Sequence, residues 1–382
     1  MKNIVILGST GSIGKSTLEV IRQNKNLFSV LAISSNSNIS HFISQILEFK
    51  PKFAIIKDQK IMATVKTQTS HINCKFISGE DAFEEFKAQV PFFDCLVAAI
   101  SGISGMIPTL SLMEKCKILA IANKESVICA GRFLIQKARE SNVKILPIDS
   151  EHNSLLRLMQ GIDKNDIIKY TITASGGKVF GKTIIELEKF SLKDALSHPN
   201  WSMGGKITID SNTMANKALE LMEACILFDI NYKKIDAIIH TKSIIHGLIE
   251  SKDRGVSAFL ANPNMQIHIA NVISNGKINL ETQTPKLDLL QIKTLDFHEI
   301  PHDTYKAFYL GKFALKQSHE AQIIFNASNE ISIEKFCKEE IKFLQIPQII
   351  QKALEYDFKL QIQCIEDVIH LDKITRDFCK NI

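Results

Sequence analysis

The sequence predicts an α/β protein that begins with a doubly wound parallel sheet and continues into a central α+β domain and a C-terminal α-helical domain. Three observations carry this prediction. Short apolar runs alternate with amphipathic stretches over residues 1–148, a glycine-rich turn follows the first run, and residues 304–382 show helical periodicity. Buried strands that alternate with helices are typical of a parallel sheet covered on both faces.

Residues 1–148 contain six apolar runs that we expect to be buried strands of a Rossmann-like sheet. They are residues 3–7, 29–34, 53–56, 94–100, 117–122 and 143–148. Helical patterns occupy the stretches between them. These residues are therefore expected to form a nucleotide-binding domain.

From residue 149 to about 275 the pattern changes to that of an α+β domain. Expected elements are a helix after 153, a strand at 170–175, a polar loop at 198–205, a helix at 213–228 and strands at 237–240 and 257–261. Residues 276–303 are irregular and contain Pro285 and Pro301, which indicates a linker. Residues 304–382 then form the helical domain, with 3.6-residue apolar spacing at 306–316 and 346–356.

Composition indicates an ordinary globular protein of 382 residues with two or three domains. The net charge of +5 is too small to favour nucleic acid as a partner but suits a small anionic substrate. No apolar run approaches the roughly 18 residues of a membrane span, and the N-terminus leaves no room for a signal peptide. Eight cysteines without metal-binding spacing are typical of reduced thiols, so we expect a cytoplasmic protein.

The stretch GSTGSIG follows the first expected strand and precedes a helix that should begin near Ile13. Gly8, Gly11 and Gly14 would let the backbone turn tightly beside a pyrophosphate at the positive end of that helix. The spacing GxxGxxG differs from the usual GxGxxG. A glycine turn needed only for packing is the alternative.

The residues after the second expected strand indicate which dinucleotide binds. A carboxylate there would accept the ribose hydroxyl groups of NAD, but the chain reads SNSNIS from residue 35 after Ser34 and has no acid. Asn36, Ser37 and Asn38, together with Ser34, could donate hydrogen bonds to a 2′-phosphate. We therefore expect NADP, with an ordinary polar loop as the alternative.

Two further stretches end strands at the same expected edge of the sheet. In IANKES at 121–126, Lys124 and Glu125 are candidate site residues, and a solvated helix start is the alternative. In LPIDSEHNSLL, Asp149 and Glu151 point to the same side if the extended conformation continues. Oxygen ligands of this kind favour Mg²⁺ or Mn²⁺. The alternative is a helix N-terminus capped by Ser150 or Asn153.

The segment from 196 to 224 contains a possible lid and a possible third carboxylate. Trp201 lies between Pro199 and the pair Gly204–Gly205, so it could close over a substrate or could be a core anchor. On the following helix, Asn216 and Lys217 are neighbours of Glu220. Glu220 could be a third carboxylate for the metal, with the amide and the cation beside it for an anionic substrate. The alternative is a surface ion pair. The tight turn SGG at 175–177 could approach a phosphate.

Together, GSTGSIG, ANKES, DSEHNS, SGG, HPNWSMG and NKALE have the order and spacing of the 1-deoxy-D-xylulose 5-phosphate reductoisomerase family, and NASNE at 326–330 is similar to a further family segment. The resemblance extends over the whole chain. It implies an NADP-dependent oxidoreductase of isoprene biosynthesis that acts as a homodimer. It implies that the substrate is a sugar phosphate, which is converted to 2-C-methyl-D-erythritol 4-phosphate in the non-mevalonate pathway.

The resemblance also implies roles for individual residues. The metal, Mn²⁺ or Mg²⁺, would be held by Asp149, Glu151 and Glu220. The substrate would be held by Lys124, Ser150, Glu151, Ser175, His198, Trp201, Ser211, Asn216, Lys217 and Glu220. NADPH would contact Gly8, Thr10, Gly11, Ser12, Ile13, Asn36, Ser37, Asn38, Asn123, Glu125 and Gly204. Lys124, Asp149, Glu151, His198 and Glu220 would be catalytic.

The implied chemistry is a rearrangement followed by reduction. The metal would act as a Lewis acid toward the ketone and a neighbouring hydroxyl group, and NADPH would reduce the branched aldehyde. Retro-aldol cleavage with re-aldolisation is the family's favoured course, with a direct α-ketol shift as the alternative. Ser37 and Gly205 stand where many members have basic residues. A metal-independent NADP dehydrogenase and a non-catalytic NADPH sensor are the alternative function classes.

Overall fold

The structure is a computed structural model that describes residues 1–196, 204–276 and 280–382. The chain forms two compact units. Unit 1 comprises Met1–Ser126, Leu134–Asn153 and Asn264–Thr284, and unit 2 comprises Val127–Phe133, Ser154–Pro263 and Pro285–Ile382. The domain boundaries expected after residues 148, 275 and 303 stay predictions.

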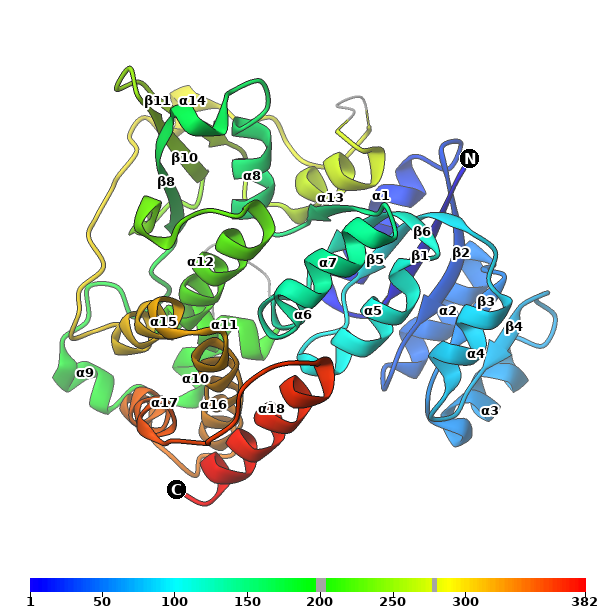
Figure 1. Cartoon of the computed structure of the whole chain (residues 1–382). Helices are drawn as coiled ribbons and strands as arrows, with labels where there is room; N and C mark the ends of the chain where they lie inside the picture. Colours follow the sequence, from blue (N-terminus) through cyan, green and yellow to red (C-terminus); the bar gives the residue numbers. More distant parts are fainter. Residues whose placement is uncertain (197–203, 277–279) are drawn as a thin grey trace. The chain divides into compact units, whose positions relative to one another are not determined.

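Unit 1 is built on a seven-stranded parallel sheet (Figure 1). Its strands are β1 (Lys2–Leu7), β2 (Phe28–Ser34), β3 (Phe53–Ile55), β4 (Lys75–Ile77), β5 (Phe93–Ala98), β6 (Cys116–Ile121) and β7 (Lys144–Pro147). Their order is β4-β3-β2-β1-β5-β6-β7, and every pair is parallel. All six expected strands are present and the doubly wound sheet is confirmed. The short edge strand β4 was missed, because three residues with an exposed Lys75 give no apolar run.

The order of the strands explains where a ligand would bind in unit 1. The chain runs from β1 outward to β4, returns to β5 beside β1, and then runs outward to β7. Right-handed crossovers therefore place helices on both faces of the sheet. Strand order reverses between β1 and β5, and ligands of such sheets bind at the carboxyl ends of the strands at that point.

The helices of unit 1 connect consecutive strands of this sheet, except α13, which comes from a later segment of the chain. They are α1 (Ser12–Gln23), α2 (Ile39–Phe49), α3 (Gln59–Gln68), α4 (Ala82–Gln89), η1 (Ile103–Gly105), α5 (Met106–Met113), most of α7 (Arg132–Glu140) and α13 (Met265–Ser274). Helix α1 packs against α13, and α4 packs against α5. The residues of α6 (Lys124–Ala130) and α8 (Ser150–Leu158) are divided between the two units. Ile4, Val5 and Ile6 in β1 are fully buried, as expected for a central strand covered on both faces.

The residues after β7 do not continue the strand, so the expectation that Asp149 and Glu151 lie side by side on an extended segment is wrong. The strand ends at Pro147, and α8 begins at Ser150. The Asp149 carbonyl oxygen accepts the first helical bond, from Asn153 N at 2.8 Å, and its carboxylate accepts a bond from Glu151 N at 3.3 Å. The helix-start alternative describes this conformation, with Asp149 as the capping residue.

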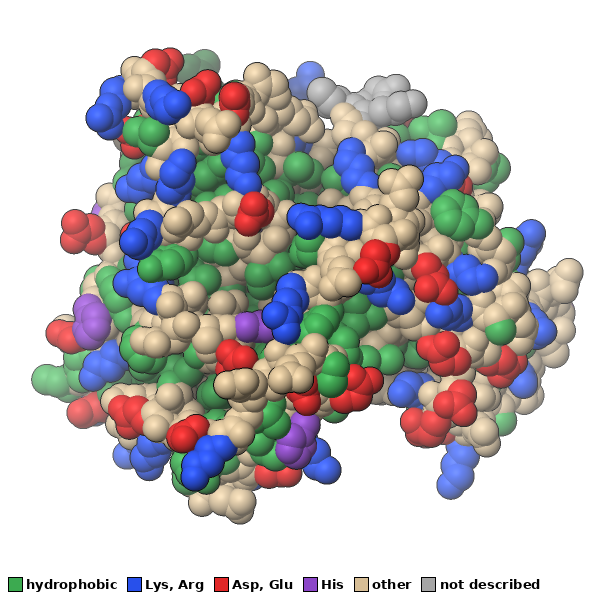
Figure 2. All heavy atoms as spheres, viewed as in Figure 1, with side chains coloured by type: hydrophobic (Ala, Val, Ile, Leu, Met, Phe, Trp, Pro, Cys, Tyr) green, Lys and Arg blue, Asp and Glu red, His purple; other side chains and the backbone are tan. Residues whose placement is uncertain are grey.

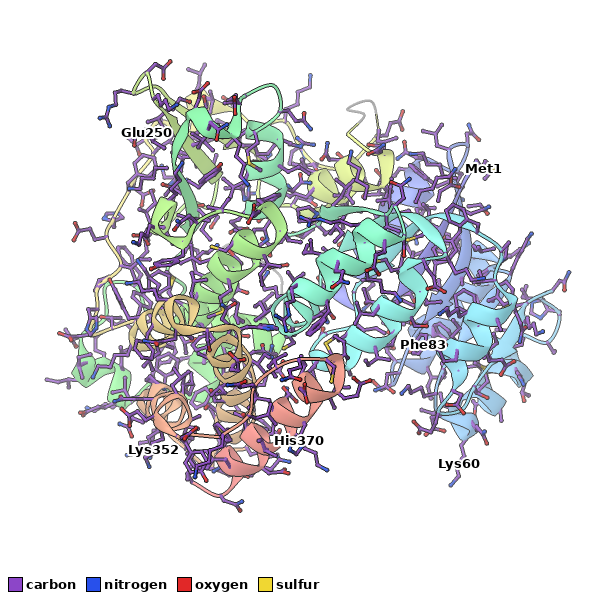
Figure 3. The ribbon with its side chains drawn as sticks, in the orientation of Figure 1. Met1, Lys60, Phe83, Glu250, Lys352 and His370 are labelled. Atoms are coloured by element: carbon purple, nitrogen blue, oxygen red, sulfur yellow. The ribbon has the colours of Figure 1, made fainter. Side chains whose placement is uncertain are left out.

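Unit 2 contains a smaller mixed sheet of four strands. They are β8 (Ile167–Ala174), β9 (Ile235–Ile239), β10 (Ile245–Ser251) and β11 (Val256–Leu260), in the order β11-β10-β8-β9. The strands expected near 170, 237 and 257 are present. The central strand β10, on which Figure 3 labels Glu250, was missed, because His246 and Gly247 interrupt its apolar pattern.

The remainder of unit 2 is mostly helical, as expected for the C-terminal residues. Its helices are α9 (Ile184–Glu188), α10 (Leu192–Ala195), α11 (Gly205–Thr213), α12 (Ala215–Phe228), α14 (Leu289–Ile292), α15 (Lys306–Gln317), α16 (His319–Cys337), α17 (Ile346–Glu355) and α18 (Ile365–Lys380), with short 3₁₀ turns η2 (Lys164–Asp166), η3 (Tyr232–Lys234) and η4 (Phe343–Gln345). Helix α16 packs against α17 and α18, and α12 packs against α15. Met214, in the left-handed conformation with φ 59°, separates α11 from α12.

Among the described residues, no helix is long and apolar enough to span a membrane. Figure 2 shows Lys and Arg side chains mixed with Asp and Glu side chains over the face that it displays.

Candidate active site

The glycine turn after β1 is shaped for close approach of a ligand to the backbone. Gly8 has φ 79°, and a Cβ there would lie 2.6 Å from the carbonyl oxygen of Ala99, which follows β5. Gly11 is the N-cap of α1, which begins at Ser12 as predicted, and no side chain caps this end. The first turn of α1 contains no acidic residue. The N-terminus of α1 therefore has the free N–H groups and the positive potential that a phosphate requires.

The loop after β2 is tied to this turn by hydroxyl groups. Gly8 N donates to Ser34 Oγ at 3.0 Å, and the hydroxyl groups of Thr10 and Ser35 lie 2.8 Å apart. Asn38 caps α2 by accepting a bond from His41 N at 3.4 Å. Ser37 therefore lies just before a helix N-terminus, where the helix dipole favours a negatively charged group.

Asn123 joins the loops after β5 and β6. Its Nδ2 donates to the carbonyl oxygens of Ile100 and Gly102, and its Oδ1 accepts a bond from Ser126 N in the first turn of α6. Lys124 and Glu125 follow and are both buried. The alternative of a solvated helix start at this position is therefore wrong.

Lys124 pairs with Asp149 at the carboxyl edge of the sheet. The two residues follow the adjacent parallel strands β6 and β7, and their side chains are 10% and 12% exposed. Ser150 donates a hydrogen bond from Oγ to the carboxylate of Glu151. The structure thus brings Lys124, Asp149, Ser150 and Glu151 together in unit 1. Carboxylate and hydroxyl oxygens lie here beside one cation, and water has little access to the Lys124–Asp149 pair.

Glu220 has a comparable environment on α12 in unit 2. Asn216 Nδ2 donates to one of its carboxylate oxygens, and Lys217 Nζ donates to the other. The side chains of Lys217 and Glu220 are only 5% and 2% exposed. The predicted shared helix face is confirmed, and the alternative of a surface ion pair is wrong because the pair is buried.

Ser175 and Ser211 also lie in unit 2, on different elements. Ser175 begins the turn after β8, where Gly176 and Gly177 have φ of 79° and 62°, and its Oγ accepts a bond from Gly177 N at 3.2 Å. Ser211 lies near the end of α11, a helix whose N-cap is Gly204. His198 and Trp201 lie outside the described residues.

Sequence reasoning missed buried residues that contact the predicted ones. His152 is fully buried, with Nδ1 3.7 Å from Asp149 Oδ1. The sequence suggests only a capping role for Asn153. In the structure its Nδ2 donates to Pro147 O and Asn271 Oδ1, both at 3.2 Å, and its Oδ1 lies 3.2 Å from His268 Nδ1. The sequence contained no signal for these contacts, because Asn271 and His268 lie on α13, more than a hundred residues further along the chain.

Comparison with known proteins identifies one family along the chain. The model for 1-deoxy-D-xylulose 5-phosphate reductoisomerase matches residues 4–131, and two models for C-terminal domains of the same enzyme match residues 145–228 and 260–378. The Clostridium tetani enzyme of this name is 39% identical over 100% of this chain and 99% of its own. The Lachnospira eligens enzyme is 36% identical over the full length of both chains.

Solved structures of the same enzyme are similar to this chain in fold. A crystal structure of DOX-P reductoisomerase in complex with NADPH, fosmidomycin and magnesium superposes with a TM-score of 0.93, at 32% identity over 100% of this chain and 98% of the other. The Zymomonas mobilis enzyme in complex with NADPH gives a TM-score of 0.92 at 31% identity, with the same coverage.

Proposed function

The chain belongs to the 1-deoxy-D-xylulose 5-phosphate reductoisomerase family, and on this premise we propose its reaction. It is an NADPH-dependent oxidoreductase that requires a divalent metal, and it converts 1-deoxy-D-xylulose 5-phosphate to 2-C-methyl-D-erythritol 4-phosphate in the non-mevalonate isoprenoid pathway. One observation carries the proposal: the uncapped glycine turn and the buried Lys124–Asp149 pair lie on the same carboxyl edge of the sheet.

NADPH binds at the glycine turn of unit 1, and residues 1–148 serve as its binding domain. The pyrophosphate lies against the uncapped start of α1, and the 2′-phosphate lies at the start of α2, near Ser37. Polar and backbone groups around the turn complete the site. In this proposal they are Gly8, Thr10, Gly11, Ser12, Ile13, Asn36, Asn38, Asn123, Glu125 and Gly204.

Asp149, Glu151 and Glu220 hold Mg²⁺ or Mn²⁺. Three carboxylates form a hard oxygen donor set, which fits these ions, and the neighbouring cations Lys124 and Lys217 limit the negative charge when the ion is absent. When bound, the ion supplies Lewis acidity toward the ketone and hydroxyl oxygens of the sugar, and NADPH supplies the hydride.

The remaining site residues bind and orient the sugar phosphate. Lys124 donates to a substrate oxygen beside the carboxylates, where low exposure strengthens its electrostatic effect. Asn216 and Lys217 hold the Glu220 carboxylate in place and offer their remaining donors to the substrate. Ser150, Ser175 and Ser211 donate from their hydroxyl groups. The resemblance assigns substrate contacts to His198 and Trp201 as well, with Trp201 in a lid over the site.

The test is an absorbance assay that follows NADPH oxidation with 1-deoxy-D-xylulose 5-phosphate and Mg²⁺ or Mn²⁺. Turnover that stops in a chelator and returns with added metal supports the proposal. Metal-independent turnover of another substrate would instead favour a simple dehydrogenase, and NADPH binding without any turnover would favour a sensor.

A homodimer that works in the cytoplasm completes the proposal. Strand β11 lies at the end of the four-stranded sheet, and Val256 on this strand is 62% exposed, while Leu290 on α14 is 87% exposed. Such edges and apolar side chains are suited to a partner surface. None of the eight cysteines is in a disulfide, which suits a reducing compartment. Light scattering should show a dimer for the wild type and a monomer for the double variant Val256→Glu with Leu290→Glu. If the double variant has the mass of the wild type, this surface is not the dimer interface.

A further inference from the structure

Asn212 is a buried amide between the two serines that we assign to the substrate in unit 2. It lies on α11 directly after Ser211, and its exposure is 0%. The family resemblance gave it no role. A buried amide is costly to retain unless its donors and acceptor are satisfied, so its partners indicate what it holds.

The three hydrogen bonds of Asn212 join three segments of unit 2. Its Oδ1 accepts a bond of 2.7 Å from Lys178 N, in the turn that begins at Ser175. Its Nδ2 donates to Thr208 O at 3.1 Å within α11 and to Ala195 O at 2.9 Å, at the end of α10. The side chain therefore ties the Ser175 turn to the helix that carries Ser211.

The turn itself is packed directly onto this amide. Gly177 has φ 62°, and a Cβ at this position would lie 2.5 Å from Asn212 Oδ1. On the preceding residue, the Gly176 carbonyl oxygen accepts a hydrogen bond of 2.8 Å from Tyr305 Oη. Tyr305 is fully buried, and burial raises the pKa of its hydroxyl group, so this donor stays protonated. Two glycines of high conformational freedom are thus fixed by two buried side chains.

We propose that Asn212 is a positioning residue for the phosphate group of the substrate, because it fixes the spacing between Ser175 and Ser211. This inference rests on the proposed function. Without the amide, Lys178 N loses its acceptor and the Ser175 turn loses its link to α11. The two hydroxyl groups are then no longer held at a fixed spacing, and ordering them around the phosphate costs binding free energy. Tyr305 supports the same turn through Gly176.

The experiment compares Asn212→Ala with the wild-type enzyme in full steady-state kinetics. The KM for 1-deoxy-D-xylulose 5-phosphate and the competitive inhibition constant of inorganic phosphate should both rise about tenfold, the loss expected for one buried hydrogen bond. The Kd of NADPH should not change. A purely structural defect would lower kcat through the active fraction and leave KM and the phosphate constant unchanged.

Two further variants complete the test. Asn329→Ala is the matched control. Asn329 is equally buried and donates to Asp210 on α11 at 2.6 Å, a bond that does not involve the turn, so the KM of this variant should stay within twofold of the wild type. Tyr305→Phe keeps the core intact and should raise KM in the same direction as Asn212→Ala, which tests the turn even if Asn212→Ala does not fold.

The inference is overturned by either of two results. One is an unchanged KM and phosphate constant in Asn212→Ala, or in Tyr305→Phe if the first variant does not fold. The other is an equal rise in Asn329→Ala. Wild-type turnover tests the proposed function separately, so an active wild-type enzyme beside an unaffected Asn212→Ala variant contradicts only this inference.

Discussion

Each unit contains a buried lysine–carboxylate pair, and the two pairs are built in different ways. Lys124 and Asp149 are 25 residues apart and meet because β6 and β7 are adjacent strands of a parallel sheet. Lys217 and Glu220 lie on one turn of α12, where Asn216 contacts the same carboxylate. The first pair depends on tertiary structure, whereas the second needs only a helix.

The difference shows that a contact within one helix can be predicted from local sequence, whereas a contact between two strands cannot. Helical spacing alone places Lys217 beside Glu220, and the structure confirms that prediction. The sequence placed Lys124 and Asp149 on the same edge of the sheet, but it did not predict that they form an ion pair. In both cases burial removes water, so that each lysine offsets a charge that would otherwise be costly.

The largest expected effects come from removing each lysine in turn. Lys124→Met should lower kcat by about 10²- to 10³-fold, the range for loss of one preorganised donor at a reacting centre. Lys217→Met should act mainly on KM for the sugar phosphate, by about tenfold or more, through loss of a charge-assisted hydrogen bond. Steady-state kinetics with saturating Mg²⁺ distinguish the two. If Lys124→Met raised KM and left kcat normal, Lys124 would have the same binding role as Lys217, and the proposed difference between the two lysines would be wrong.

A change outside both pairs sharpens the comparison. Ser37→Asp places a negative charge at the start of α2, where the 2′-phosphate is proposed to lie. The KM for NADPH should rise roughly tenfold, because about 1.4 kcal/mol of repulsion corresponds to that factor, whereas the KM for NADH should hardly change. Metal dependence should be as in the wild type. Equal effects on both cofactors would show that this loop does not read the 2′ position.

The smallest expected effect concerns His319, the first residue of α16 in unit 2. Burial lowers its pKa, although its Nε2–H donates to the carbonyl oxygens of Ile128 and Cys129 at 3.0 and 3.1 Å. The folded-state pKa is therefore below the unfolded value, so the unfolded state gains protons first as pH falls. Stability present at neutral pH should therefore decrease as pH falls below about 6.5, toward the lower pKa of the folded state.

His319→Gln keeps a donor at this position but cannot titrate. Urea unfolding from about pH 8 to about pH 5 should therefore show a shallower pH dependence for His319→Gln than for the wild type. Identical slopes would mean that protonation of His319 is not linked to folding.

Local patterns predicted most strands, all but β4 and β10, and most helices. Tertiary contacts explain the errors at the site. The apolar runs of β1, β5 and β6 are unambiguous because central parallel strands are buried on both faces. The conformation of Asp149 was predicted incorrectly, because an extended continuation and a helix start both suit the same acidic residues. The partners of Asn153 and Asn212 follow from packing between distant segments, which no local spacing encodes.

The most direct test of the proposed metal site is turnover against Mn²⁺ concentration for Glu151→Gln and Glu220→Gln. Each variant keeps its shape and loses one charge, so both should require at least about tenfold more Mn²⁺ for half-maximal turnover, while the Kd of NADPH stays unchanged. Glu250→Gln removes a carboxylate of β10 that pairs with the exposed Arg254; it is the matched control and should behave as the wild type. Normal turnover of either site variant in a chelator would contradict a metal held by these carboxylates.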